Sequence, residues 1–157
     1  MSVPETQMQV LRRICWRLEG EPILWAVTGS LGLALQGVPV PVHDIDLQTD
    51  AAGAYAIERC FKDDVTRPVT YSSGERIRSH FGALTLDGIQ VEIMGDVEHL
   101  LPPGQWKPAP DLATLLRLIE FADLQVPVLP LEFERQAYLE LGRTEKAEII
   151  RRAMQER

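Results

Sequence analysis

His43-Asp44-Ile45-Asp46-Leu47-Gln48 alternates polar and apolar side chains from end to end. A period of two predicts a half-buried strand. Residues two apart on a strand point to the same face, so Asp44 and Asp46 lie together while Ile45 faces the core. Neighbouring carboxylates repel each other unless water solvates them or a cation lies between them, and Mg²⁺ prefers such oxygen ligands. The stretch is therefore a candidate metal site, although taken alone it is also typical of a solvated strand face.

A hairpin further along the chain supplies a third carboxylate. Residues 81–86 and 89–94 are joined by Asp87-Gly88, a dipeptide typical of two-residue hairpin turns. Such a turn fixes the register of the two strands, which sets Glu92 opposite the small residue Ala83 on the polar face. If the hairpin lies beside the first strand, three carboxylates converge on one surface, as two-metal phosphoryl chemistry requires.

Thr28-Gly29-Ser30 separates an apolar strand-like run, residues 23–27, from a short predicted helix over residues 31–36. Gly29 permits close approach to the backbone, and Ser30 can cap the helix or donate to a phosphate. The N-terminus of a helix also favours negative charge. A turn of this kind beside a carboxylate site is where a triphosphate would lie.

The remaining segments predict the rest of the fold. Helical periodicity and capping predict helices over residues 4–19, 50–61, 111–124, 130–141 and 143–155. A short strand is expected near residues 69–71, and the Pro-rich residues 101–110 are the best candidate boundary. We therefore expect an α/β domain of about four strands with an N-terminal helix over residues 1–100, a linker over 101–110 and a helical C-terminal extension over 111–157.

The composition limits the classes of partner. The 157 residues include 16 Lys and Arg against 23 Asp and Glu, a net charge of −7. Non-specific nucleic-acid binding needs a basic surface, so we do not expect it. Cys15 and Cys60 are far apart and lack the spacing of a zinc site, so buried thiols in a reducing compartment are expected. No apolar run is long enough for a signal peptide or a membrane span, which predicts a cytoplasmic protein.

Three segments, taken in order, carry a family resemblance. Val27-Thr28-Gly29-Ser30-Leu31, Asp44-Ile45-Asp46-Leu47 and Val91-Glu92-Ile93 resemble the pattern of the polymerase-beta-type nucleotidyltransferase superfamily. That pattern is an apolar strand, a Gly-Gly or Gly-Ser turn, a helix, an Asp-x-Asp strand and a later strand with one acidic residue. The spacing is similar to that of the minimal aminoglycoside-nucleotidyltransferase and toxin–antitoxin branches. The resemblance implies an α/β (α+β) fold, with a mixed sheet and flanking helices.

The resemblance also implies a chemistry. Asp44, Asp46 and Glu92 would hold two Mg²⁺ ions, with Glu92 acting either as a ligand or as the base that takes the acceptor's proton. Gly29 and Ser30 would contact a nucleoside triphosphate, expected to be ATP. The transferred group is expected to be AMP, and the acceptor a hydroxyl on a small molecule, a protein or a tRNA. The small size also suggests a homodimer as a hypothesis.

One segment departs from the family pattern. Many members have Arg and Ser shortly before the first Asp, where this chain has Val40-Pro41-Val42-His43. The change removes a cation that could contact phosphate, and Arg76 or Arg78 could replace it. Arg143 and Lys146 could reach a phosphate, but we interpret them as part of a solvated helix start. The departure keeps an alternative open, in which a catalytically weak or inactive member acts as a nucleotide-binding, antitoxin or interaction module.

Overall fold

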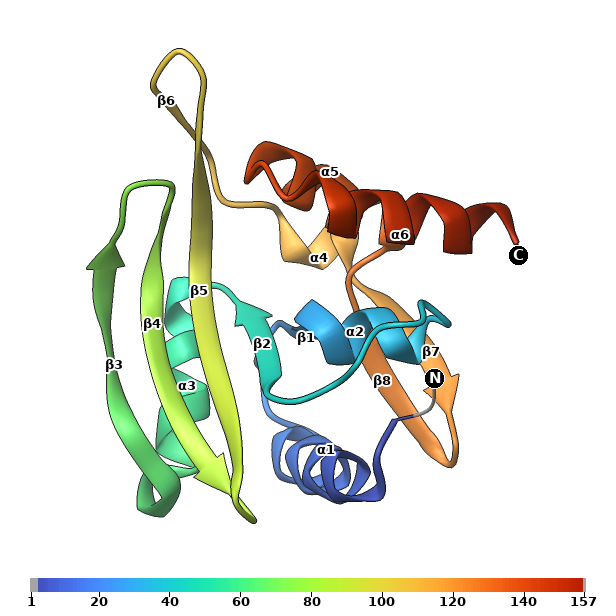
Figure 1. The fold of residues 1–157 in the computed structure, drawn as a ribbon. Helices are drawn as coiled ribbons and strands as arrows, with labels where there is room; N and C mark the ends of the chain where they lie inside the picture. Colours follow the sequence, from blue (N-terminus) through green and yellow to red (C-terminus); the bar gives the residue numbers. More distant parts are fainter. Residues whose placement is uncertain (1–2, 157) are drawn as a thin grey trace.

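Eight strands and six α-helices are present in residues 3–156, the part of the chain that the computed structural model describes (Figure 1). The helices are α1 (Glu5–Leu18), α2 (Gly29–Leu35), α3 (Ala51–Cys60), α4 (Leu112–Leu115), α5 (Leu131–Glu140) and α6 (Thr144–Gln155). The strands are β1 (Trp25–Thr28), β2 (Ile45–Thr49), β3 (Val65–Ser73), β4 (Ile77–Leu86), β5 (Ile89–Leu101), β6 (Gln105–Lys107), β7 (Arg117–Phe121) and β8 (Leu124–Val128). The first two residues and the last residue of the units predicted above lie outside the described range.

The strands form one mixed sheet in the order β3-β4-β5-β2-β1-β8-β7, and β6 pairs with the end of β5. The short strand β2 lies at the centre, antiparallel to β1 and parallel to β5. In Figure 1 the long strands β3, β4 and β5 form one wing of the sheet, and β8 and β7 form the other. Helices α5 and α6 pack against each other, and α5 also contacts β5. The predicted mixed sheet with flanking helices is therefore confirmed.

The β4–β5 hairpin has the register that its turn predicts. Leu84 pairs with Val91, and Ala83 pairs with Glu92. Both turn residues, Asp87-Gly88, have positive φ, as the predicted two-residue turn requires. Leu84 and Val91 are fully buried, and burying an aliphatic side chain of this size stabilises the fold by about 1.5–3 kcal/mol. One face of the hairpin is thus core, which leaves Glu92 on the other.

Four predicted helices are confirmed as α1, α3, α5 and α6, whose ends agree with the predicted ends within one residue. The predicted strand at residues 69–71 is longer than expected, because β3 spans nine residues. The Pro-rich stretch is also more regular than expected. β5 continues to Leu101, and β6 returns beside it with Gln105 paired to Leu101. The sheet therefore extends into the segment that was expected to be a linker, and it has eight strands rather than about four.

The expected helix over residues 111–124 is wrong, because only Leu112–Leu115 are helical there. β7 and β8 follow as a hairpin whose turn holds Ala122 at φ 54. The Leu, Glu and Ala residues of this stretch favour a helix, and no Gly or Asn marks the turn, so local propensity points the wrong way. β8 instead pairs with β1 in parallel, and its Val126 and Val128 are fully buried. Burial in the sheet outweighs propensity here, and residues 117–128 are not part of a helical extension.

Cys15 and Cys60 are free and half-buried, so the thiols are less buried than expected. Burial, assisted by the charge of Glu19, raises the pKa of Cys15 to about 11. None of the helices within residues 3–156 combines the length and the apolar character that crossing a membrane requires.

Candidate active site

Asp46 and Glu92 lie side by side at the centre of the sheet. They are register partners on the parallel strands β2 and β5, and Thr28 of β1 is the partner of Asp46 on its other side. Neighbouring strands are about 5 Å apart, so one row runs from Thr28 through Asp46 to Glu92. The hairpin thus lies beside the Asp strand, as convergence of the carboxylates requires. Asp44 is exposed in a bend directly before β2, not within the strand as predicted.

The electrostatics of this row centre on Asp46. Burial, followed by the charges of Glu92 and Asp44, raises the pKa of Asp46 to about 6, against an opposing attraction from Lys146. Both neighbouring carboxylates are therefore close enough to repel it. A cation among them would remove the repulsion, and carboxylate oxygens are ligands that Mg²⁺ accepts. The donor set fits the metal that the resemblance implies.

The carboxylates do not form a closed metal cage on their own. Among residues 3–156, no three His, Cys, Asp or Glu side chains are already gathered closely enough to hold a metal ion. A bound cation would have to draw Asp44, Asp46 and Glu92 closer together.

Gly29 is pressed against Asp46. It adopts φ +64, and a Cβ built on it would lie 2.2 Å from Oδ2 of Asp46. Only glycine avoids both the backbone strain and this overlap. Ser30 follows in the first turn of α2 and is half-buried. The turn thus brings an open stretch of backbone and a hydroxyl to the edge of the carboxylate row.

Glu134 of α5 lies behind this turn and was not predicted from the sequence. Its two carboxylate oxygens lie 2.7 and 2.9 Å from the Thr28 hydroxyl, and its side chain is almost wholly buried. Burial raises the pKa of Glu134 to about 7, although hydrogen bonds from Thr28 and the Gly29 amide oppose the rise. The charge of Asp46 adds to it. Glu134 therefore connects α5 to the turn that carries Gly29.

The cations nearest to Asp46 are not those expected. Arg76 donates to the Glu140 carbonyl at 3.2 Å, and Arg78 is paired with Glu98. These contacts engage both side chains away from the carboxylate row. Arg143 and Lys146 instead lie over the ring of Tyr138, 5.2 and 5.6 Å from its centroid. Lys146 is half-buried and attracts Asp46, so the interpretation of this helix start as merely solvated is wrong for Lys146.

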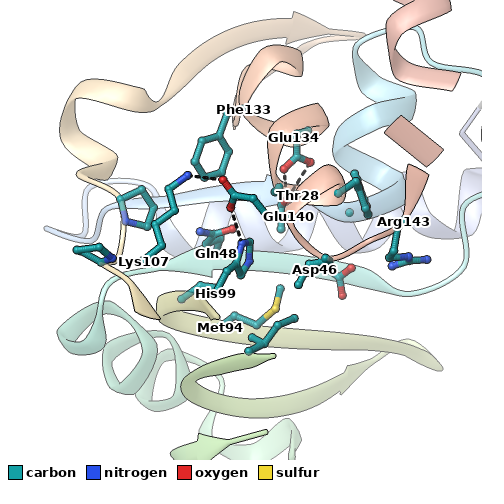
Figure 2. A pocket seen from close by; sticks show the side chains of 18 residues that line it. Thr28, Asp46, Gln48, Met94, His99, Lys107, Phe133, Glu134, Glu140 and Arg143 are labelled. Atoms are coloured by element: carbon teal, nitrogen blue, oxygen red, sulfur yellow. Dashed lines mark hydrogen bonds and ion pairs between the residues drawn. The ribbon is translucent and has the colours of Figure 1, made fainter. Parts of the chain in front are cut away.

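A cavity of about 200 Å³ opens beside Asp46. Figure 2 shows Asp46 and Arg143 toward one end of it and Lys107 toward the other, with Glu140, Gln48 and Met94 between. Gly29 and Thr28 line the same cavity, whereas Asp44, Glu92 and Ser30 do not. The cavity therefore meets the carboxylate row at Asp46 and extends away from it, beneath α5.

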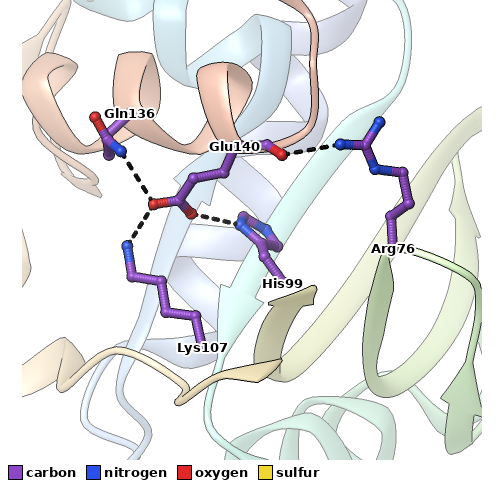
Figure 3. A network of polar contacts seen from close by, with 5 residues as sticks. All are labelled: Arg76, His99, Lys107, Gln136 and Glu140. Atoms are coloured by element: carbon purple, nitrogen blue, oxygen red, sulfur yellow. Dashed lines mark hydrogen bonds and ion pairs between the residues drawn. The ribbon is translucent and has the colours of Figure 1, made fainter. Parts of the chain in front are cut away.

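Glu140 lies in the wall of this cavity beside Lys107. Its carboxylate accepts from Lys107 Nζ at 2.7 Å and from Gln136 at 3.2 Å, and it lies 3.0 Å from Nδ1 of His99 (Figure 3). Burial raises the pKa of Glu140, but the hydrogen bonds from Lys107, His99 and Gln136 together hold it below the usual range. Arg76 holds the carbonyl of the same residue. The network ties the end of α5 to β5, β6 and the start of β4.

Sequence reasoning missed Glu134 and the Glu140 network for different reasons. Glu134 lies three residues after the buried Leu131, on the inner face of a helix that was predicted correctly. A carboxylate three residues after Leu131, on the same face of a predicted helix, was the signal in the sequence that could have indicated a buried charge. His99 and Glu140 are 41 residues apart, and nothing local links them.

The comparisons with known proteins agree with this geometry. A candidate nucleotidyltransferase from Thermotoga maritima is 54% identical, with a TM-score of 0.86, and the match covers 100% of this chain and 97% of that one. Two antibiotic-modifying enzymes share the fold at low identity. The lincosamide adenylyltransferase LnuA, bound to lincomycin, is 12% identical with a TM-score of 0.56, over 95% of this chain and 98% of that one. ANT(2'')-Ia in complex with adenylyl-2''-tobramycin is 14% identical with a TM-score of 0.56, over 96% and 98%.

A search of curated proteins found no match. The sequence pattern of the aminoglycoside-2''-adenylyltransferase family, in contrast, matches residues 10–154, which include all three carboxylates, the Gly29 turn and helices α5 and α6 up to Met154. The predicted nucleotidyltransferase fold and superfamily are thereby confirmed, since the similarity extends over almost the whole chain. This chain is a nucleotidyltransferase that belongs to the aminoglycoside-2''-adenylyltransferase family.

Proposed function

We propose that the protein transfers a nucleoside monophosphate, expected to be AMP, from a nucleoside triphosphate to an acceptor hydroxyl. The row formed by Asp46 and its register partner Glu92 carries the proposal, because the glycine turn lies directly against it. The likeness to adenylyltransferases that modify antibiotics supports the same reaction.

Asp44, Asp46 and Glu92 would hold the metal, expected to be two Mg²⁺ ions. When bound, these ions supply the positive charge that neutralises the triphosphate and the departing pyrophosphate. The three carboxylates of the chain orient that charge. Asp46 contributes most from within the sheet, because it is half-buried on β2 whereas Asp44 is exposed directly before the strand.

The remaining roles fall to residues around the row. Gly29 leaves its backbone open to a phosphate, and the Ser30 hydroxyl can donate to the same group. Arg143 and Lys146 supply the cations that the segment before Asp44 lacks. In the reaction the acceptor oxygen bonds to the α-phosphorus while the bond to pyrophosphate breaks. The hydroxyl proton passes to a carboxylate, for which Glu92 is the candidate.

Labelled ATP tests the proposal. With Mg²⁺ and a panel of hydroxyl compounds, the wild-type protein should release pyrophosphate and label an acceptor. Asp44→Asn and Asp46→Asn should each lower the rate by at least about a hundredfold, since each removes a metal ligand. Asp63→Asn is a matched control, because Asp63 is exposed and makes no ion pair within residues 3–156.

Calorimetry separates the proposal from its alternative. Mg²⁺-dependent ATP binding without pyrophosphate release from any acceptor would favour an inactive nucleotide-binding module. Absence of any Mg²⁺-dependent nucleotide binding would contradict both and leave an interaction module. The homodimer stays a prediction, and a solution mass of one chain at micromolar concentration would contradict it.

A further inference from the structure

The cavity beside Asp46 is small. Its volume is about 200 Å³, whereas pockets for drug-sized ligands occupy about 300–1,000 Å³. Its floor is formed by the strand residues that follow the carboxylates, with Gln48 two positions beyond Asp46 and Met94 two positions beyond Glu92. A ligand in this cavity would therefore be a compact molecule, or one compact group of a larger molecule, placed next to Asp46.

Gln48 contributes an uncharged polar group to the cavity wall. Its side chain is 7% exposed, and its amide makes no hydrogen bond with another residue of the described chain. Its amide atoms are not sealed from solvent, since Arg135 Nε is the only fully buried side-chain polar atom without a partner among residues 3–156. A ligand that replaces water at Gln48 must match the hydrogen bonds of the amide, because an unpaired buried amide costs free energy. Gln48 points to the same face as Asp46, and Figure 2 shows it in the cavity wall. An uncharged group that both donates and accepts is thus available to a ligand.

Away from Asp46, the carboxylates around the cavity are already engaged and offer a cation no free partner. Glu140 is already engaged by Lys107, His99 and Gln136, and Glu134 is turned toward Thr28. Lys107 and Arg143 are positive and line the cavity. The other groups in the wall are mostly apolar side chains, among them Met94, Val97, Phe133 and Leu141. An ammonium group placed inside would lose its water and find no free carboxylate beyond Asp46.

We propose that this cavity holds the acceptor, and that the acceptor is a compact, uncharged hydroxyl compound whose second polar group is hydrogen-bonded by Gln48. The assignment rests on the proposed function, since it places the acceptor hydroxyl next to the phosphorus held at Asp46. A polycationic sugar does not fit this wall, although the family is named for such acceptors.

The nucleobase is the competing occupant of the cavity. A purine brings several ring and exocyclic polar atoms on its edges. The wall carries charged side chains and the rings of Phe133 and Tyr138, but each polar atom of the base that it left unmatched would cost binding free energy. The cations Arg143 and Lys146 lie at the Asp46 end, which is where the phosphates of a nucleotide would be drawn. The acceptor is therefore the better match for the enclosed end.

Three matched ring compounds test the assignment on the full chain by ligand-observed NMR titration. They are cyclohexane-1,2-diol, cyclohexanol, which lacks the second hydroxyl, and 2-aminocyclohexanol, which carries an ammonium in its place. The diol should bind about tenfold more tightly than the amino alcohol and about fivefold more tightly than cyclohexanol.

Gln48→Ala, or Gln48→Met if the smaller side chain destabilises the sheet, should reduce the affinity for the diol to that for cyclohexanol. Gln48→Glu should favour the amino alcohol, and Gln125→Ala, on the exposed side of β8, should change nothing.

Adenylyl transfer to the same compounds separates this assignment from the proposed function. Transfer to the diol, lost in Asp46→Asn while diol binding persists, would support both. Transfer to another acceptor while the diol does not bind, or tighter binding of the amino alcohol or of tobramycin, would overturn the assignment alone. A Gln48→Met variant that changes the preference among ATP, GTP and CTP but not diol binding would assign the cavity to the base and overturn it as well. Diol binding without transfer to any acceptor would overturn the acceptor role together with the proposed function.

Discussion

The Thr28 hydroxyl lies within hydrogen-bonding distance of both carboxylate oxygens of Glu134, although 106 residues separate the two in the sequence. This contact joins the end of β1 to the middle of α5, directly behind the turn that carries Gly29. Because Glu134 is almost wholly buried, its charge is costly, and the folded protein retains its proton to a higher pH than the unfolded chain does.

The ionisation of Glu134 should therefore make the protein less stable as the pH rises. Its pKa is about 7 in the folded protein and 4.5 as the reference value, so the folded state binds more protons between these values. The free energy of unfolding should decrease across that window by about 3 kcal/mol and then level off. Glu134→Gln removes this dependence. The stability of the variant relative to the wild type should therefore be greater at pH 8 than at pH 5. Urea unfolding at the two pH values measures the difference.

A control for this measurement lies on the same helix. Glu132 is exposed, so Glu132→Gln should leave the pH dependence of the wild type unchanged. Equal pH dependence in wild type and Glu134→Gln would show that Glu134 is ionised in the folded protein throughout this range, contrary to the effect of its burial.

Gly29 offers a separate test of the turn. Both Gly29 and Gly37 have positive φ, but a Cβ on Gly37 meets nothing within 4 Å, whereas one on Gly29 overlaps Asp46. Alanine at either position should cost about 1–2 kcal/mol through backbone strain. Gly29→Ala should in addition lower the transfer rate by about a hundredfold, because Asp46 must move. Thermal unfolding and the rate of pyrophosphate release measure the two effects, and equal rates in the two variants would count against the role of the turn.

Local signals were sufficient for part of this architecture. The Asp87-Gly88 turn fixes which residue faces Glu92, and strand alternation fixes the face of Asp46. Both depend on residues close together in the sequence, so both could be predicted. The pairing of Asp46 with Glu92 was conditional, since it depends on which strands are neighbours.

Long-range contacts explain what could not be predicted. The β7–β8 hairpin carries helix-favouring residues, and it forms because β8 is buried beside β1. Gln48 is a polar position at the end of the alternating stretch, and only the neighbouring β5 and α5 make it part of a cavity wall. Lys146 looked like a solvated residue at a helix start, and only the packing of α6 brings it near Asp46. Each of these depends on tertiary neighbours that a single sequence does not show.

The Glu140 network should stabilise the far end of the cavity. Glu140→Gln removes the charge that Lys107 and His99 face, and we expect a loss of about 1–2 kcal/mol at pH 7. The pKa of Glu140 lies below its ordinary 4.5 in the folded protein. Its contribution is therefore present above that value and is lost as the pH falls through the lowered pKa. Chemical denaturation of both proteins at pH 7 and in acid should show the difference between them shrinking.

Gln136→Ala is the matched control for this network. Its side chain is exposed and donates to the same carboxylate at 3.2 Å, so its loss should cost less than about 1 kcal/mol. A Glu140→Gln variant as stable as the wild type at every pH would mean that water already satisfies Lys107 and His99.

The charge of Asp46, which the proposed function requires, should lower the stability of the metal-free protein. Its pKa is about 6, raised by burial and by Glu92 and Asp44, so at pH 7.5 the ionised side chain destabilises the metal-free protein. Asp46→Asn keeps the shape and removes the charge, and it should raise the free energy of unfolding of the metal-free protein by about 2 kcal/mol.

Mg²⁺ should raise the melting temperature of the wild type, because a ligand that binds only the folded state stabilises it, but it should have little effect on the variant. Scanning both proteins with EDTA and with Mg²⁺ gives all four values. An Asp46→Asn protein that melts below the metal-free wild type, or that gains as much from Mg²⁺ as the wild type does, would mean that Asp46 is neither repelled by its neighbours nor a ligand of the cation.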